Sequence, residues 1–137
     1  MILVDTTVWI DLLRDIASPE RRALEVLLAR PRILCVTDII VTEVLRGISD
    51  EQEFQKTRYY LNSFSCLTAR APRTFIHAAE LYRRCRKKGA TIRSTVDCLI
   101  GAVCIENKAS ILHHDTGFDH LIKHCGLAKA NPVTILP

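Results

Sequence analysis

The stretch of sequence that decides the fold is Met1-Ile2-Leu3-Val4-Asp5-Thr6-Thr7-Val8-Trp9-Ile10. Its apolar run is too short for a helix and contains branched side chains, which is typical of a buried strand in a parallel sheet. Asp5 stands where this strand should end and a helix begin. Because open α/β sheets bind their ligands beyond the carboxyl ends of their strands, Asp5 is a candidate functional residue.

Outward from this stretch, short apolar segments alternate with helical patterns along the whole chain. We expect further strands at Ile33–Val36, Cys66–Thr68, Ala109–Asp115 and Pro132–Leu136, with one or two helices between successive strands. The most apolar helix should run from Thr95 to about Asn107 and be buried. This alternation predicts an α/β fold in three αβα layers, with a mostly parallel central sheet.

The length and composition favour one domain over residues 1–137. The chain is 48% hydrophobic and 25% charged, which is typical of a globular protein. Its apolar runs are far shorter than the roughly 20 residues of a membrane span, and no export signal is evident at Met1. We therefore expect a cytoplasmic protein without a membrane association.

Six cysteines occur in apolar or helical patterns, and none of them forms a C-x-x-C pair. A disulfide scaffold is typical of small exported chains, and a structural zinc site usually needs closely spaced cysteine pairs. We therefore expect most of these cysteines to be buried thiols.

The formal net charge of +4 is modest, but basic residues cluster between Arg83 and Lys88. Such a run attracts polyanions and provides the salt-dependent part of nucleic-acid binding. The alternative is a solvated helix end, where cations interact favourably with the helix dipole.

Four acids fall in apolar settings. Asp5 and Asp115 each stand at the end of a predicted strand, Asp97 lies in the first turn of the most apolar helix, and Glu43 belongs to a helix that must pack on the sheet. Buried carboxylates repel one another and lose hydration, so such a cluster persists either by protonation or by holding a cation. Oxygen ligands of this kind favour Mg²⁺ or Mn²⁺.

Each acid also has a purely structural interpretation. Asp5 can cap the following helix, and Asp97 can belong to a capping box that begins at Ser94. Glu43 can point to solvent at the edge of its helix, and Asp115 can be a turn residue. Spacing alone does not decide between these roles and a metal cluster.

Four motifs occur in order along the chain: Val4-Asp5-Thr6-Thr7-Val8-Trp9-Ile10, Thr42-Glu43-Val44-Leu45-Arg46-Gly47, Asp97-Cys98-Leu99-Ile100-Gly101-Ala102 and Leu112-His113-His114-Asp115-Thr116-Gly117-Phe118. Together they resemble the PIN-domain family, specifically the VapC-type toxins of prokaryotic toxin–antitoxin pairs, over nearly the whole chain. The acids of that family correspond to Asp5, Glu43, Asp97 and Asp115. Its polar residue near the first acid corresponds to Thr6 or Thr7, whereas Gly117 stands where many relatives carry a further acid.

The resemblance implies a Mg²⁺- or Mn²⁺-dependent endoribonuclease, the toxin of a toxin–antitoxin pair. Asp5, Asp97 and Asp115 are its expected metal ligands, Glu43 completes the catalytic set, and a water molecule attacks the RNA phosphodiester. The implied partners are RNA, a cognate antitoxin and a second copy of the chain in a homodimer, and the mean hydropathy of +0.12 agrees with extensive interfaces. Our candidates for binding RNA phosphates are Arg46, Arg93, Arg86 and Lys87.

Three other functions are compatible with parts of the sequence. Histidines 113, 114, 120 and 124 and Cys125 gather near Asp115, and the pair His120 and His124 has the i, i+4 spacing of a zinc site. A receiver-like phosphoacceptor domain also has acids at strand ends, but it usually opens with paired acids, whereas Asp5 is followed by two threonines. The third alternative is a non-catalytic regulatory or interaction domain.

Overall fold

A five-stranded sheet forms the centre of the computed structural model, which describes residues 1–137. Its strands are β1 (Ile2–Val4), β2 (Leu34–Thr37), β3 (Ser65–Leu67), β4 (Ser110–Leu112) and β5 (Ala128–Lys129). They lie in the order β3-β2-β1-β4-β5, and every neighbouring pair is parallel. The prediction of an α/β fold with a parallel sheet is confirmed, and β1 is its central strand.

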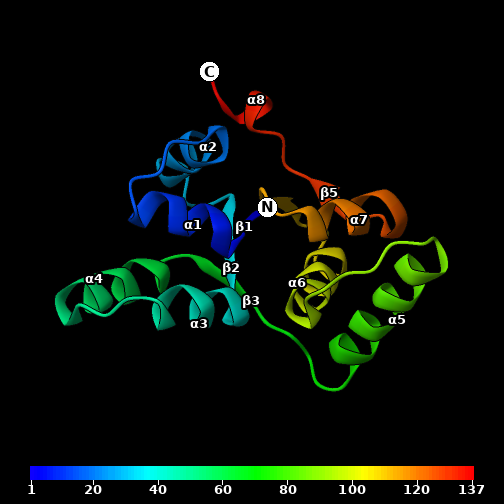
Figure 1. Cartoon of the computed structure of the whole chain (residues 1–137). Coiled ribbons are helices and arrows are strands. Elements are labelled where there is room, and N and C mark those ends of the chain that lie inside the picture. Colours follow the sequence, from blue (N-terminus) through cyan, green and yellow to red (C-terminus); the bar gives the residue numbers. More distant parts are fainter.

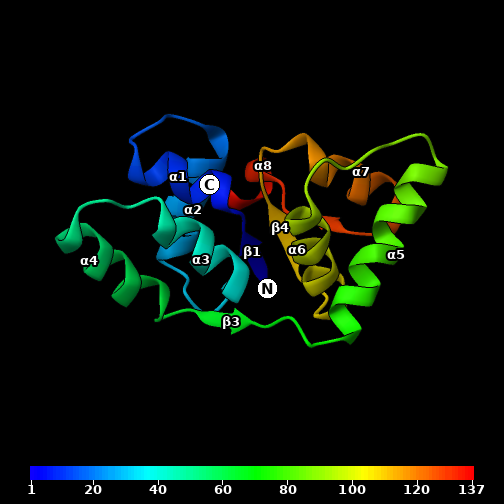
Figure 2. The same ribbon diagram turned by 60° about the horizontal axis from the view of Figure 1, so that its bottom comes forward.

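Eight helices surround this sheet (Figure 1). They are α1 (Thr6–Leu13), α2 (Pro19–Leu28), α3 (Asp38–Arg46), α4 (Glu51–Leu61), α5 (Arg73–Lys87), α6 (Thr95–Glu106), α7 (Thr116–Cys125) and α8 (Pro132–Ile135). Helix α1 packs against α2 and α3, α2 packs against α8, and α5 packs against α6 and α7. Figure 2 shows α3 with α4 at one end of the molecule and α5 beside α6 at the other, with β1 between them. None of the helices combines the length and apolarity that a transmembrane span requires.

Three helices begin at the carboxyl end of a strand or just after it, and a polar side chain caps each of them there. The Asp5 side chain accepts from Thr7 N at the start of α1, Thr37 accepts from Ile40 N at α3, and Asp115 accepts from Gly117 N at α7. Capping of this kind satisfies backbone N–H groups that have no partner within the helix. It also fixes two of the candidate acids, Asp5 and Asp115, at one edge of the sheet.

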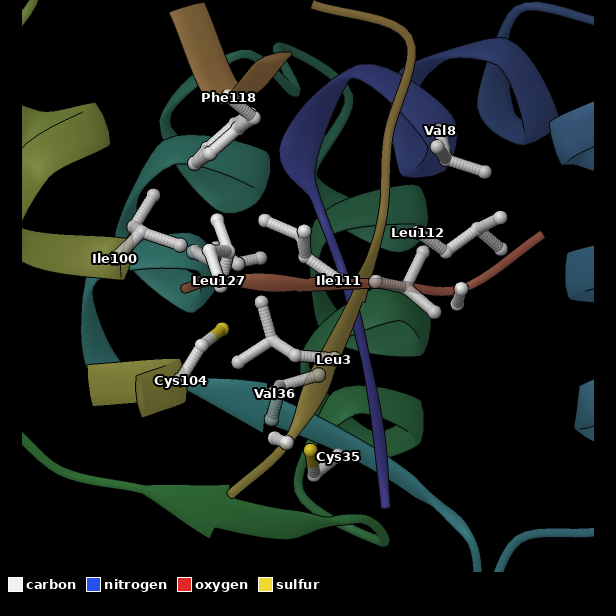
Figure 3. Close-up of a cluster of buried hydrophobic side chains, with 14 of the residues drawn as sticks. Leu3, Val8, Cys35, Val36, Ile100, Cys104, Ile111, Leu112, Phe118 and Leu127 are labelled. Atoms are coloured by element: carbon white, nitrogen blue, oxygen red, sulfur yellow. The ribbon is translucent and has the colours of Figure 1, made fainter. Parts of the chain in front are cut away.

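The core lies where β1 and β4 meet the buried face of α6. Figure 3 shows Leu3 and Ile111 from the two strands close to Ile100 and Cys104 of α6, and all four side chains are fully buried. Burying a leucine or isoleucine stabilises a fold by about 1.5–3 kcal/mol. Helix α6 is therefore held firmly beside the central strand.

The prediction of a final strand at Pro132–Leu136 is wrong. These residues form the short helix α8, in which Pro132 occupies the first turn and Asn131 caps the N–H of Val133 (3.0 Å). The last strand is β5, whose two residues are exposed and lack the apolar pattern of a buried strand. A proline at the first helical position suits a helix start, since it has no N–H to donate to a sheet.

The cysteines confirm the prediction of buried thiols. All six are free, and Cys66 in the edge strand β3 is exposed while the other five are buried. Burial raises the pKa of the Cys104 thiol and raises the pKa of Cys98 to about 11.

Candidate active site

Asp5 and Asp115 follow two strands that are direct neighbours in the sheet. Val4 of β1 pairs with Leu112 of β4, and the Asp5 N–H donates to the Leu112 carbonyl oxygen over 3.0 Å. Parallel strands end at the same edge of a sheet, so the connections that carry both acids leave this edge together.

Asp5 is almost completely buried, with only 3% of its surface exposed. Its Oδ2 atom accepts hydrogen bonds from the Thr7 hydroxyl (2.7 Å) and from the Thr7 N–H (3.2 Å). Burial raises the pKa of this carboxyl group, the bonds from Thr7 lower it, and the negative charge of Glu43 raises it further. Asp5 therefore both caps α1 and belongs to the acidic cluster.

Glu43 projects from α3 toward the end of β1. Its Oε1 atom accepts a hydrogen bond from the Thr6 hydroxyl over 2.8 Å, and the side chain is half-buried. The alternative in which Glu43 points to solvent is therefore wrong. The two threonines after Asp5 have separate partners, since Thr6 holds Glu43 and Thr7 holds Asp5.

Asp97 faces the other three acids from the first turn of α6. Its N–H donates to the Ser94 hydroxyl, which is the capping half of the predicted box (3.4 Å). Burial, followed by the charges of Asp115, Asp5 and Glu43, raises the pKa of its carboxyl group to about 7. The side chain of Asp97 thus lies in the acidic cluster and does not accept a hydrogen bond from the Ser94 N–H, which would complete the capping box.

No cation balances these four carboxylates within the chain. Every ion pair of the structure involves other acids, namely Asp11, Asp15, Glu25, Glu106 and Asp119. A group of acids that repel one another and lack a basic partner is costly for the fold, which is a feature of functional sites.

Gly117 lies against two of the acids. Its N–H donates to Asp115 Oδ1 over 2.9 Å. A Cβ atom at this position would come within 2.7 Å of Asp97 Oδ2 and within 3.5 Å of Asp115 Oδ1. Any side chain at position 117 would therefore enter the cluster, and glycine leaves Asp97 and Asp115 their present positions.

The four acids fit a hard divalent cation by their chemistry. They offer only carboxylate oxygens, and a bound cation would offset both the burial and the repulsion that raise the pKa of Asp97. In this structure no three His, Cys, Asp or Glu side chains come close enough together to hold a metal ion. Mg²⁺ keeps several of its water molecules and takes few protein ligands.

The histidines near Asp115 have separate roles. His113 is buried, and its Nδ1 accepts the Asp115 N–H (3.0 Å), so the proton of the neutral ring is on Nε2. Burial lowers the pKa of His113, which keeps the ring neutral. The His114 side chain is instead directed at α1, where its Nε2 forms a hydrogen bond with Asp11 Oδ2 (2.9 Å). His113 and His114 thus have other partners and are not available to complete a zinc site with His120 and His124.

Sequence reasoning missed Asp11, which is only 6% exposed. One of its oxygens, Oδ2, accepts from Ser18 (2.8 Å) and lies 2.9 Å from His114 Nε2. The pair ties α1 to the connection that carries Asp115. A single acid in an otherwise apolar helical segment is the only sequence signal for this role, and its partner lies 103 positions away.

The predicted RNA-binding cations remain predictions. Arg46 is in the last turn of α3, Arg86 and Lys87 are in the last turn of α5, and Arg93 lies between α5 and α6. All four are exposed, and none of them forms an ion pair.

Comparisons with known proteins agree with this fold and these motifs. The profile of the PIN domain matches residues 2–123. VapC ribonuclease Mb1587 of Mycobacterium bovis and ribonuclease VapC11 of Mycobacterium tuberculosis are each 34% identical over 135 residues, which cover 96% of this chain and 98% of theirs.

Solved structures show the same fold at lower identity. VapBC2 from Rickettsia felis, bound to a promoter DNA fragment, is similar with a TM-score of 0.73 and 18% identity, covering 96% of this chain and 98% of that chain. FitAcB from Neisseria gonorrhoeae has a TM-score of 0.74 and 22% identity, covering 97% of this chain and 99% of that chain. The chain therefore belongs to the PIN-domain family, in its VapC branch.

Proposed function

We propose that the chain is a Mg²⁺- or Mn²⁺-dependent endoribonuclease that acts as the toxin of a toxin–antitoxin pair. The observation that carries this proposal is the group of four carboxylates at one sheet edge, which have no basic partner; burial and the charges of the other three acids raise the pKa of Asp97 to about 7. The relatives of 34% identity that are named ribonucleases support RNA as the substrate.

In this proposal Asp5, Asp97 and Asp115 hold the cation. The bound ion supplies positive charge at the scissile phosphate and lowers the pKa of a water molecule. Because the pKa of Asp97 is about 7, cation binding and release of the Asp97 proton are linked near neutral pH.

The two threonines orient the acids for this task. Thr7 fixes Asp5 Oδ2 through two hydrogen bonds, and Thr6 fixes Glu43 Oε1 through one. Glu43 Oε2 accepts no hydrogen bond from the protein, so it is free to hold the attacking water and take its proton. Buried His113 is neutral and already bonded to the Asp115 N–H, so we assign it no proton transfer.

The proposed partners are an antitoxin and a second copy of the chain, in the cytoplasm. Several solved structures of this fold are described as toxin–antitoxin or VapBC complexes. A cluster of free carboxylates is a suitable target for a basic segment of an antitoxin, which would occupy the place of the cation.

Metal dependence tests the proposal directly. The purified protein should cleave single-stranded RNA with Mg²⁺ or Mn²⁺, lose this activity with a chelator, and regain it when either ion is added in excess. We expect zinc alone not to restore it, because the donor set contains only carboxylate oxygens. Undiminished cleavage in the chelator, or recovery with zinc alone, would contradict the proposed metal site.

A further inference from the structure

A groove of about 450 Å³ lies between α5 and α6, away from the four acids. Figure 2 shows the two helices side by side, joined by the connection that carries Arg93. The apolar residues that line the groove include Phe75 and Tyr82 from α5 and Leu99 from α6, and the polar ones include Arg83 and Arg93. None of its ten lining residues is acidic.

The lining combines flat apolar surfaces with unpaired positive charge. Phe75 leaves 49% of its surface exposed, and Tyr82, which lies two helical turns further along the same face of α5, is half-buried. Arg83 and Arg93 are exposed and form no ion pair. Aromatic side chains stack on unpaired bases of RNA, and arginines contact the adjoining phosphates or stack on bases themselves.

The groove and the acids lie on opposite faces of the same helix. Thr95, Cys98 and Leu99 line the groove and share one face of α6 at i, i+3 and i+4, whereas Asp97 projects from the far side. The width of a helix, about 10 Å, separates the two faces. An RNA strand that crosses the first turn of α6 can place one phosphate at the acids and the base of a nearby nucleotide in the groove.

We propose that this groove binds an unpaired base of single-stranded RNA next to the cleaved phosphodiester, with Phe75 and Tyr82 stacking on the base and Arg83 and Arg93 contacting its phosphates. The inference rests on the proposed ribonuclease function and adds a place outside the acidic cluster where the RNA substrate is bound. The volume lies within the range of small-ligand pockets, roughly 300–1,000 Å³. The absence of acids and the two free arginines favour a polyanion over a neutral protein segment.

The test compares Phe75→Leu and Tyr82→Leu with the wild type. Each substitution keeps an apolar side chain but removes the stacking surface, and exposed Phe75 can be changed without opening the core. Tyr59→Leu is the matched control, because Tyr59 is 82% exposed on α4 and does not line the groove. Unfolding curves would establish that all variants are folded.

Binding of a single-stranded RNA is measured in an Asp5→Asn background, where no cleavage is expected. We expect Phe75→Leu and Tyr82→Leu to weaken binding about tenfold and the control to leave it unchanged. Arg83→Gln should weaken binding and lower the salt slope by about one. In cleavage by otherwise unchanged protein, the two aromatic substitutions should raise KM more than they lower kcat, since the groove does not contact the reacting atoms.

Abasic RNAs identify the contact itself. Among RNAs that each lack one base, loss of the base at one position should weaken binding to the parent protein. The same loss should not weaken binding to the Phe75→Leu variant any further, since that variant already lacks the side chain that contacts this base. Equal losses in both proteins at every position would overturn the inference.

Other occupants of the groove give different results. If the wild type cleaves RNA and the groove variants bind RNA normally, the groove inference fails while the ribonuclease proposal stands. Retained RNA binding with loss of the antitoxin, or with conversion of a dimer to monomers, would assign the groove to a protein partner instead. A wild-type protein that neither binds nor cleaves RNA would overturn both proposals.

Discussion

Asp97 is the residue whose proposed role in the site conflicts most clearly with the stability of the fold. Its carboxyl group has a pKa of about 7 because it is half-buried and because three other acids surround it. An ordinary aspartate has a pKa of 3.8, so the folded chain holds a proton on Asp97 that the unfolded chain has already released at pH 5 or 6. A buried acid of this kind lowers the stability of the fold at neutral pH, which is a common cost of functional sites.

The raised pKa of Asp97 predicts how stability depends on pH. Its contribution is fully present below pH 3.8 and is lost as the pH rises through about 7, because the unfolded chain releases this proton at a lower pH than the folded chain does. We expect Asp97→Asn to make the protein more stable than the wild type at pH 8, with a smaller difference at pH 4. Urea unfolding at both pH values measures this.

The same substitution should reduce stabilisation by Mg²⁺, since a cation that binds only the folded state stabilises it. Equal stability of wild type and Asp97→Asn at pH 8, together with an equal response to Mg²⁺, would contradict the role given to Asp97.

At the scale of elements, the site depends on the close approach of α6 and α7. Gly117 in the first turn of α7 allows Asp97 of α6 to lie where a Cβ atom would be only 2.7 Å from its Oδ2. Gly117 thus leaves room for the close approach of the two helix starts.

This contact predicts the effect of Gly117→Ala. The added methyl group must displace the Asp97 carboxylate, and we expect RNA cleavage to fall about 10- to 100-fold, as displacements of about 1 Å can cause. The helix itself should not be weakened, because alanine favours helices more than glycine does. Gly47→Ala is the matched control, since a Cβ atom there meets only Val44 O at an ordinary distance of 3.7 Å. Wild-type cleavage by Gly117→Ala would show that the position of Asp97 is not critical.

The elements that could be predicted are those with local signals. β1 and β4 are apolar and a capping side chain follows each of them, so both strands and the acids Asp5 and Asp115 could be predicted from the sequence. The predicted strand Ala109–Asp115 is too long, because β4 ends at Leu112 and Asp115 instead caps α7. The two residues of β5 are exposed and have no such pattern. Pro132–Ile135 has the composition of a strand, but Asn131 and Pro132 start a helix there.

At the scale of the molecule, the features that could not be predicted depend on packing between distant segments. The pairing of Glu43 with Thr6 joins α3 to α1, and the pairing of Asp11 with His114 joins residues 103 positions apart. The groove between α5 and α6 exists only once these helices are packed. The set of four acids was available from the sequence, whereas the partners that orient two of them required the fold.

The whole account depends on the claim that the acids at the end of β1 and β4 carry out RNA cleavage. Asp5→Asn tests it most directly, because asparagine caps a helix as well as aspartate does and should leave the fold intact while removing a charge from the cluster. Asp15→Asn is the matched control, since the Asp15 side chain is 89% exposed and its only ion pair is with Arg21. The measurement is the rate of single-stranded RNA cleavage in Mg²⁺ by folded samples of wild type and both variants. We predict a loss of at least about a hundredfold for Asp5→Asn and none for Asp15→Asn, and cleavage by Asp5→Asn at the wild-type rate would contradict the account.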